Sequence, residues 1–132
     1  LEAVDWNVGD VLGHIDVIKV YSPVEVHDPE VDELVDRILE KCADKGLALD
    51  LNARGLIKHY GEVYPSPKIL RRAAELGVPI IPGDDSHRPD DVGLNFWASS
   101  QIARAAGFEE VRLPDRLGGH RWSLSGKEVI RV

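Results

Sequence analysis

The sequence predicts an α/β fold in which parallel strands alternate with outer helices and a C-terminal hairpin follows. Two observations lead to this prediction. Short apolar runs alternate with longer segments whose apolar residues recur at helical spacing. The longer segments also carry helix-start signals at one end and glycine at the other. Such strand–helix–strand units form parallel sheets, and their connections are right-handed almost without exception. Three or four of these units would form a small open sheet or half of a barrel.

The first unit covers residues 10–46. Residues 10–14 are a short apolar run ending in polar residues, as a buried parallel strand does at its C-terminal end. Asp28 and Pro29 predict the start of a helix, and Lys45-Gly46 predicts its end. The apolar residues expected on one face of this helix are Val31, Leu34, Val35, Ile38, Leu39 and Cys42. Cys42 is therefore expected in the core and not as a nucleophile.

The same pattern repeats over residues 47–81. A strand is expected at 47–52, and a long loop follows it. Ser66 and Pro67 predict the N-cap and first turn of the next helix, which Gly77 ends. A third strand is expected at 78–81, where Pro79 limits the early pairing.

The last part of the chain continues with a helix and ends in a hairpin. A helix is expected at 96–106 and a further strand at 110–113. The hairpin is expected to pair 121–124 with 128–132 through a turn at 125–126.

The composition limits the classes of protein to which the chain can belong. Its 132 residues suffice for a single domain, residues 1–132, with a core of its own. There is no run of about 18 apolar residues, so we expect no membrane span. The formal net charge of −7 disfavours a nucleic-acid partner. The single cysteine fits a reducing compartment, and we expect a cytoplasmic protein.

The chain contains no methionine, even at position 1. A natural reading frame begins with methionine, and residues 1–4 resemble the end of a helix that began earlier. We therefore expect that Leu1 is not the natural start of the domain; N-terminal processing is the alternative.

Two histidine–carboxylate pairs follow expected strands. Asp85 and His87 stand two residues apart after the strand at 78–81, and two such side chains point the same way in extended backbone. His14 and Asp16 repeat the spacing after the first strand. Imidazole and carboxylate together suit Zn²⁺, Mn²⁺ or Fe²⁺. The alternative is structural: an aspartate that caps a helix beside a surface histidine, and a hydrogen-bonded His14.

Other polar residues also lie near the expected strand ends. Asp50 and Asn52 end the second strand, and Asn52 is expected to satisfy the backbone of the following loop. The cations just beyond strand ends are Lys19, Arg54, Lys58 and Arg88. Each could meet an anionic substrate or be a solvated surface charge. The remaining histidines are His27, His59 and His120, which have no partner at ligand spacing.

Four segments, in order, resemble one protein family. Residues 13–19 are similar to its GH-x-D-L-I-K segment, 49–56 to LEINTSGL, 64–67 to YPSP, and 83–89 to GSDAH-x-P. Together they resemble the polymerase-and-histidinol-phosphatase (PHP) family in its histidinol-phosphatase branch, over roughly residues 8 to 108.

This resemblance implies the C-terminal part of a distorted (β/α)7 PHP barrel and a hydrolase of small phosphorylated substrates in histidine biosynthesis. It implies that two or three divalent metal ions (Zn, Mn or Fe) activate water in the complete site. His14, Asp85 and His87 would be catalytic metal ligands. Arg88 and Lys58 would bind the substrate phosphate.

The sequence also departs from the family pattern. Asp50 stands where LEINTSGL has glutamate, and the family's H-x-H, its next Asp-His and its bridging glutamate have no counterpart in these 132 residues. We therefore expect the chain to carry part of a metal site and to hydrolyse phosphomonoesters weakly or not at all on its own. The alternative is a non-catalytic half-barrel that forms a homodimer or pairs with an N-terminal half-domain. A nuclease or polymerase-associated PHP domain is disfavoured by the acidic charge.

Overall fold

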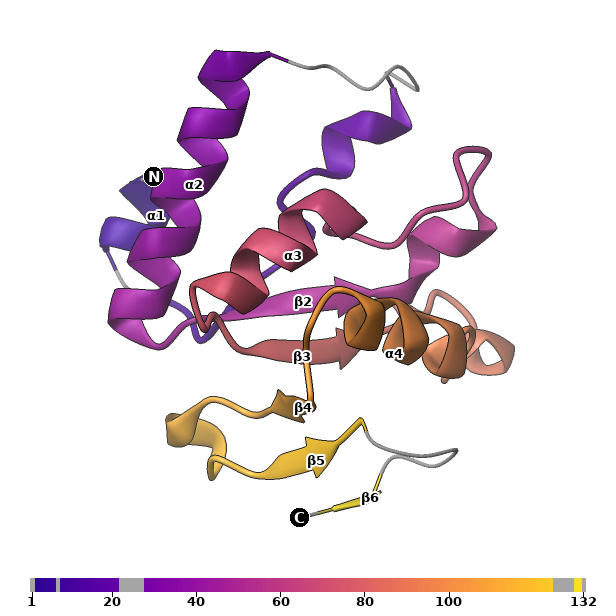
Figure 1. Cartoon of the computed structure of the whole chain (residues 1–132). Coiled ribbons are helices and arrows are strands. Elements are labelled where there is room, and N and C mark those ends of the chain that lie inside the picture. Colours follow the sequence, from indigo (N-terminus) through magenta and orange to yellow (C-terminus); the bar gives the residue numbers. More distant parts are fainter. Residues whose placement is uncertain (1, 7, 22–27, 125–129, 132) are drawn as a thin grey trace.

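A computed structural model of the chain describes residues 2–6, 8–21, 28–124 and 130–131 (Figure 1). Its first sheet is parallel, with the strand order β1-β2-β3. These strands are β1 (Val11–Leu12), β2 (Ala48–Asn52) and β3 (Ile80–Gly83). The expected parallel α/β arrangement is therefore confirmed for three strands.

Helices connect these strands and pack side by side. The α-helices are α1 (Glu2–Asp5), α2 (Pro29–Lys45), α3 (Pro67–Glu75) and α4 (Phe96–Ala105). Helix α2 follows β1, α3 follows β2 and α4 follows β3, while α3 contacts both α2 and α4. Right-handed connections between adjacent parallel strands place such helices on one face of the sheet. Within the described residues, no helix combines the length and apolarity needed to cross a lipid bilayer.

The second sheet is antiparallel and contains the expected hairpin. It joins β4 (Glu110–Arg112), β5 (Arg121–Ser123) and β6 (Ile130–Arg131) below the parallel strands in Figure 1. A fourth parallel strand at 110–113 is therefore not formed. Between β4 and β5 the chain reverses through a short 3-10 helix, η4 (Asp115–Leu117), and two glycines with positive φ. The expected turn at 125–126 lies outside the described residues.

The core lies between the parallel sheet and its helices. Leu49 and Leu51 project from one face of β2 and are fully buried. The buried residues that pack with them include Leu39, Cys42, Leu70, Ala73, Val78, Ile80, Ala103 and Val111. Cys42 is fully buried in this core, as the sequence predicted, and its burial raises the pKa of the thiol. Asp50 lies between the two leucines in sequence and therefore points to the opposite face of β2.

Two strands differ in extent from the sequence prediction. Strand β1 ends at Leu12 because His14 has φ 21°, which is incompatible with extended backbone. Strand β3 begins at Ile80, two residues later than expected. The Val78 N–H donates to the carbonyl of Ala73 at the end of α3, and Pro79 has no N–H to donate.

The apolar face of α2 is buried only in its C-terminal half. Leu39 and Cys42 are fully buried, whereas Val31 and Leu34 are 46% and 42% exposed. The N-terminal half of α2 reaches α3 through ion pairs on the surface, Asp32 with Lys68 and Asp36 with Arg72. The helical spacing therefore predicted the helix correctly but overestimated how far its apolar face is covered.

Asp28→Ala is expected to lower the free energy of unfolding by about 1 kcal/mol. The Asp28 carboxylate accepts a hydrogen bond from the Glu30 N–H at 2.9 Å and caps α2. Ser66→Ala is the matched control, because Ser66 precedes α3 in the same way but makes no side-chain cap hydrogen bond. Urea unfolding of the two variants measures the difference, and equal losses would contradict the capping role of Asp28.

Candidate metal-binding edge of the parallel sheet

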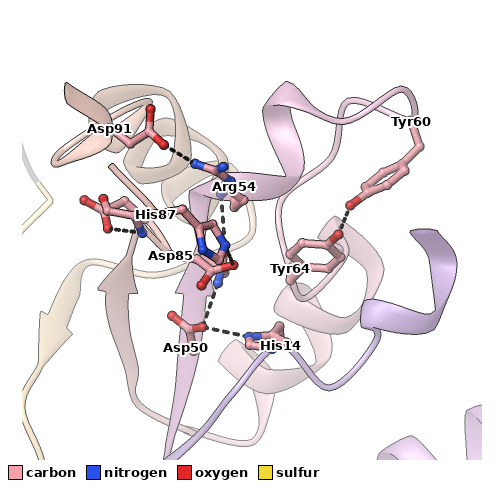
Figure 2. Close-up of polar contacts among 11 residues, drawn as sticks. His14, Asp50, Arg54, Tyr60, Tyr64, Asp85, His87 and Asp91 are labelled. Carbon is pink, nitrogen blue, oxygen red and sulfur yellow. Dashed lines mark hydrogen bonds and ion pairs between the residues drawn. The ribbon is translucent and has the colours of Figure 1, made fainter. Parts of the chain in front are cut away.

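The C-terminal ends of the three parallel strands bring four of the polar side chains together (Figure 2). His14 follows β1, Asp50 lies within β2, and Asp85 and His87 follow β3. Parallel strands end at the same edge of a sheet, where ligands gather in α/β folds. The expected clustering of polar side chains at this edge is therefore present.

His14 is paired with Asp50 and not with Asp16. The distance between His14 Nδ1 and Asp50 Oδ2 is 3.4 Å, and the two side chains are 42% and 18% exposed. The Asn52 amide also donates to Asp50 Oδ2, at 3.0 Å. Asp50 therefore faces His14 from the neighbouring strand, which the spacing of two residues along one strand does not predict.

Asp85 and His87 form the second pair, at 3.7 Å between Asp85 Oδ2 and His87 Nε2. Their side chains are 45% and 67% exposed. The sequence suggested that extended backbone brings the two side chains together. This is wrong, because Asp85 has φ 49°. Asp84 supports this turn by accepting hydrogen bonds from the N–H groups of Ser86 and Gly93. These hydrogen bonds hold the pKa of the Asp84 carboxyl below its usual range, and the one from Gly93 has the largest effect.

Gly83 brings β3 close to the Asp50 carboxylate. A Cβ atom at position 83 would lie 2.2 Å from Asp50 Oδ1. The absence of a side chain at Gly83 therefore makes room for Asp50 on the adjacent strand, where the register aligns Asn52 with Gly83.

Tyr64 and Tyr60 border the same region, and the sequence assigned neither of them a role. The rings of His14 and Tyr64 have centroids 6.1 Å apart, and the hydroxyls of Tyr60 and Tyr64 are in contact (Figure 2). Burial raises the pKa of the Tyr64 phenol, and the charges of Asp16 and Asp85 raise it further. Tyr64 therefore stays neutral beside the histidine. Its position in the YPSP-like segment was the only signal in the sequence.

Arg54 and Asp91 link the segments that follow β2 and β3. Arg54 Nη1 donates to Asp91 Oδ2 at 2.7 Å, and the side chains are 15% and 21% exposed. This hydrogen bond lowers the pKa of the Asp91 carboxyl, and the nearby charge of Arg88 adds to the effect. Arg54 Nε is buried without a hydrogen-bond partner among the described residues. Arg54 is therefore a partly buried cation held by a carboxylate, and not a solvated surface charge.

The two cations expected to bind phosphate lie on exposed loops. Lys58 ends the 3-10 helix η2 (Ala53–Ile57), and Arg88 precedes the 3-10 helix η3 (Pro89–Asp91). Both side chains are exposed. Arg88 and His87 both lie near Asp91, so Arg88 is close to one of the histidine–carboxylate pairs. In the described part of the chain, no contact joins Lys58 to either pair.

The remaining predicted residues have local roles. Asn52 Oδ1 accepts from the Arg54 N–H at 2.9 Å, as expected for a residue that satisfies the loop backbone. The His59 side chain is exposed and its ring packs edge-on against Tyr60. The centroid of the His120 ring lies 6.2 Å from that of Trp122, and His120 is far in sequence from the ends of the parallel strands β1 to β3. His27 lies outside the described residues.

The two histidine–carboxylate pairs stay separate from each other as potential ligand sets. Across residues 2–6, 8–21, 28–124 and 130–131, no three His, Cys, Asp or Glu side chains form a group that could hold a metal ion. The described chain therefore offers two sets of two donors.

Comparisons with known proteins point to one kind of enzyme. The chain is 36% identical over 107 residues to the "Probable histidinol-phosphatase" of Deinococcus radiodurans. This match covers 81% of the chain and 40% of that protein. A protein of the same name from Clostridium acetobutylicum is 32% identical over 113 residues, covering 82% of this chain and 44% of that protein. The chain is homologous to part of the histidinol-phosphatases. The sequence motifs predicted this relationship, and it is confirmed.

A solved structure supports the same relationship at the level of the fold. The crystal structure of the "putative histidinol phosphatase hisK" from Listeria monocytogenes has a TM-score of 0.64 and 30% sequence identity to the chain. The match covers 72% of this chain and 39% of that one. The chain thus spans less than half the length of the curated relatives it matches. No protein-family model matches the chain.

Proposed function

We propose that this chain forms one side of the active site of a metal-dependent histidinol-phosphate phosphatase. The observation that carries the proposal is the placement of two separate histidine–carboxylate pairs at the same edge of the parallel sheet. The names of the relatives supply the substrate class. The proposal also includes the finer fold, in which β1, β2 and β3 are part of a (β/α)7 barrel that another segment or chain completes.

The donor set fits divalent metal ions of the zinc, manganese and iron group. His14, Asp85 and His87 supply imidazole nitrogen and carboxylate oxygen, and all three side chains are about half exposed or more. When bound, such ions would generate hydroxide from water at neutral pH and neutralise charge on the phosphoryl oxygens. Asp50 would orient His14 through Nδ1 and leave Nε2 as the ligand atom.

Cations of this chain would hold the substrate phosphate. Arg88 and Lys58 are exposed and can move toward an anion, as a long side chain on a loop does. Arg54 is held by Asp91 near the same edge and adds positive charge there. Two or three metal ions need more ligands than His14, Asp85 and His87 provide, so we expect the remaining ligands to come from outside the 132 residues.

A chimera tests this proposal. In it, this chain replaces the matching segment of the Deinococcus radiodurans protein, and phosphate release from histidinol phosphate is measured with Mn²⁺ and with a chelator. We expect Mn²⁺-dependent hydrolysis by the chimera and little or none by the isolated chain. A folded chimera that binds Mn²⁺ but does not hydrolyse histidinol phosphate would contradict the proposal. Rapid Mn²⁺-dependent hydrolysis by the isolated chain would contradict the need for further ligands.

A further inference from the structure

Lys19 is turned into the protein and is largely shielded from solvent. Its side chain is 18% exposed and lies at the end of the 3-10 helix η1 (Val17–Val20). The ammonium nitrogen lies 2.7 Å from the Val63 carbonyl oxygen, 3.0 Å from Asp16 Oδ2 and 3.5 Å from Glu62 Oε2. An ammonium group has three donors, and three acceptors surround this one.

Asp16 adds a second connection between the same two segments. Its Oδ2 atom accepts from the Ser66 N–H at 2.8 Å as well as from Lys19. The Lys19–Asp16 pair thus binds the loop on both sides of Tyr64, through Val63 and Ser66. Both side chains are largely buried, at 18% and 15% exposed, where charge-assisted hydrogen bonds are screened less than at the surface.

The Lys19 cation also contacts the aromatic rings of the loop. It lies 4.8 Å from the centroid of Tyr64 and 5.5 Å from that of Tyr60, both within the range of a cation–π interaction. These contacts favour one position of the Tyr64 ring relative to the segment that carries His14.

We propose that Lys19 is a positioning residue that, with Asp16, fixes the Tyr64 loop against the His14 segment and so sets the relative position of the His14 and Tyr64 rings. Its importance for catalysis rests on the proposed function, but the positioning itself is a property of the isolated chain. Lys19 acts through His14 and Tyr64 and does not itself contact the substrate.

Nuclear magnetic resonance of the metal-free chain tests the positioning directly. In Lys19→Met, we expect the nuclear Overhauser effect between the His14 and Tyr64 rings to disappear. We also expect the amide hydrogens of Tyr64 and Ser66 to exchange about tenfold faster or more, while that of Leu49 in β2 is unchanged. Lys68→Met is the matched control, because Lys68 pairs with Asp32 at 2.7 Å but joins α3 to α2 on the exposed surface. Equal effects of the two variants, or an unchanged ring-to-ring signal in Lys19→Met, would overturn the proposal.

A conservative variant separates the role of the cation from that of the fold. Lys19→Arg keeps a cation that can reach Asp16 and the Val63 carbonyl, so we expect it to restore the ring-to-ring signal. Loss of that signal in Lys19→Arg as well would count against the cation. If Lys19→Met does not fold, Lys19→Gln takes its place, and unchanged exchange at Tyr64 and Ser66 in that variant would overturn the proposal. Both readouts need neither metal nor substrate, so an inactive chimera would leave them intact.

Discussion

Replacing His87 with alanine is expected to lower kcat of the chimera for histidinol phosphate by about 100-fold or more. The His87 side chain is 67% exposed, and its imidazole forms an ion pair with Asp85. Its imidazole is therefore available to a metal ion, and its removal would take one ligand from that ion. Phosphate release at saturating Mn²⁺ gives kcat, and the dependence on Mn²⁺ concentration gives the apparent affinity.

His59→Ala is the control for this substitution. His59 also lies on a loop beyond a strand end, but its ring packs against Tyr60, and it forms no ion pair with a carboxylate among the described residues. We expect its kcat to stay within about twofold of the unsubstituted chimera, as for a surface substitution. A His87→Ala chimera with unchanged kcat and unchanged Mn²⁺ dependence would remove His87 from the set of metal ligands.

Gly55→Ala is expected to lower the free energy of unfolding of the chain by about 3 kcal/mol. A Cβ atom at this position would lie 1.9 Å from the Glu62 carbonyl oxygen and 3.2 Å from Cε2 of Tyr64. The first of these contacts is with backbone, so a rotamer change cannot relieve it. The loop between η2 and Tyr64 would have to move, and the side chains that depend on it would move as well. Urea unfolding of the purified chain measures the loss.

Gly9→Ala provides the comparison for Gly55→Ala. A Cβ atom at Gly9 would meet only the Val11 carbonyl oxygen, at 4.0 Å. Alanine also restricts the unfolded chain more than glycine does, so we expect an unchanged or slightly higher free energy of unfolding. A loss at Gly55 no larger than that at Gly9 would show that the loop yields without cost.

Local patterns in the sequence predicted much of the fold. Helix α2 was predicted from Asp28, Pro29 and Gly46, since capping and chain reversal depend on the residues at that place. The direction of the strand at 110–113 depends on its partner in space, so its antiparallel pairing with β5 did not follow from the same patterns. Ser66 was expected to cap α3, but its side chain makes no cap hydrogen bond, and its N–H donates to Asp16.

The candidate site was predictable in its members but not in its pairing. Parallel strands end at the same edge of a sheet, so residues that follow the predicted strands are expected at that edge. These residues are His14, Asp85 and His87. The pairing of His14 with Asp50 joins residues 36 positions apart, and the left-handed backbone at Asp85 depends on the contacts of Asp84. In the sequence, Lys19 was one of the four cations expected just beyond strand ends. Only the folded loop, with its carbonyl and tyrosine rings, distinguishes it from the others.

The close approach of Gly83 to Asp50 has an evolutionary consequence. The space that a side chain at position 83 would need is filled by the Asp50 carboxylate on the next strand. A mutation from Gly83 to any larger residue therefore becomes tolerable only together with a smaller or displaced side chain at position 50. Among descendants of this chain, acceptance of a larger residue at position 83 is therefore expected to depend on the side chain at position 50.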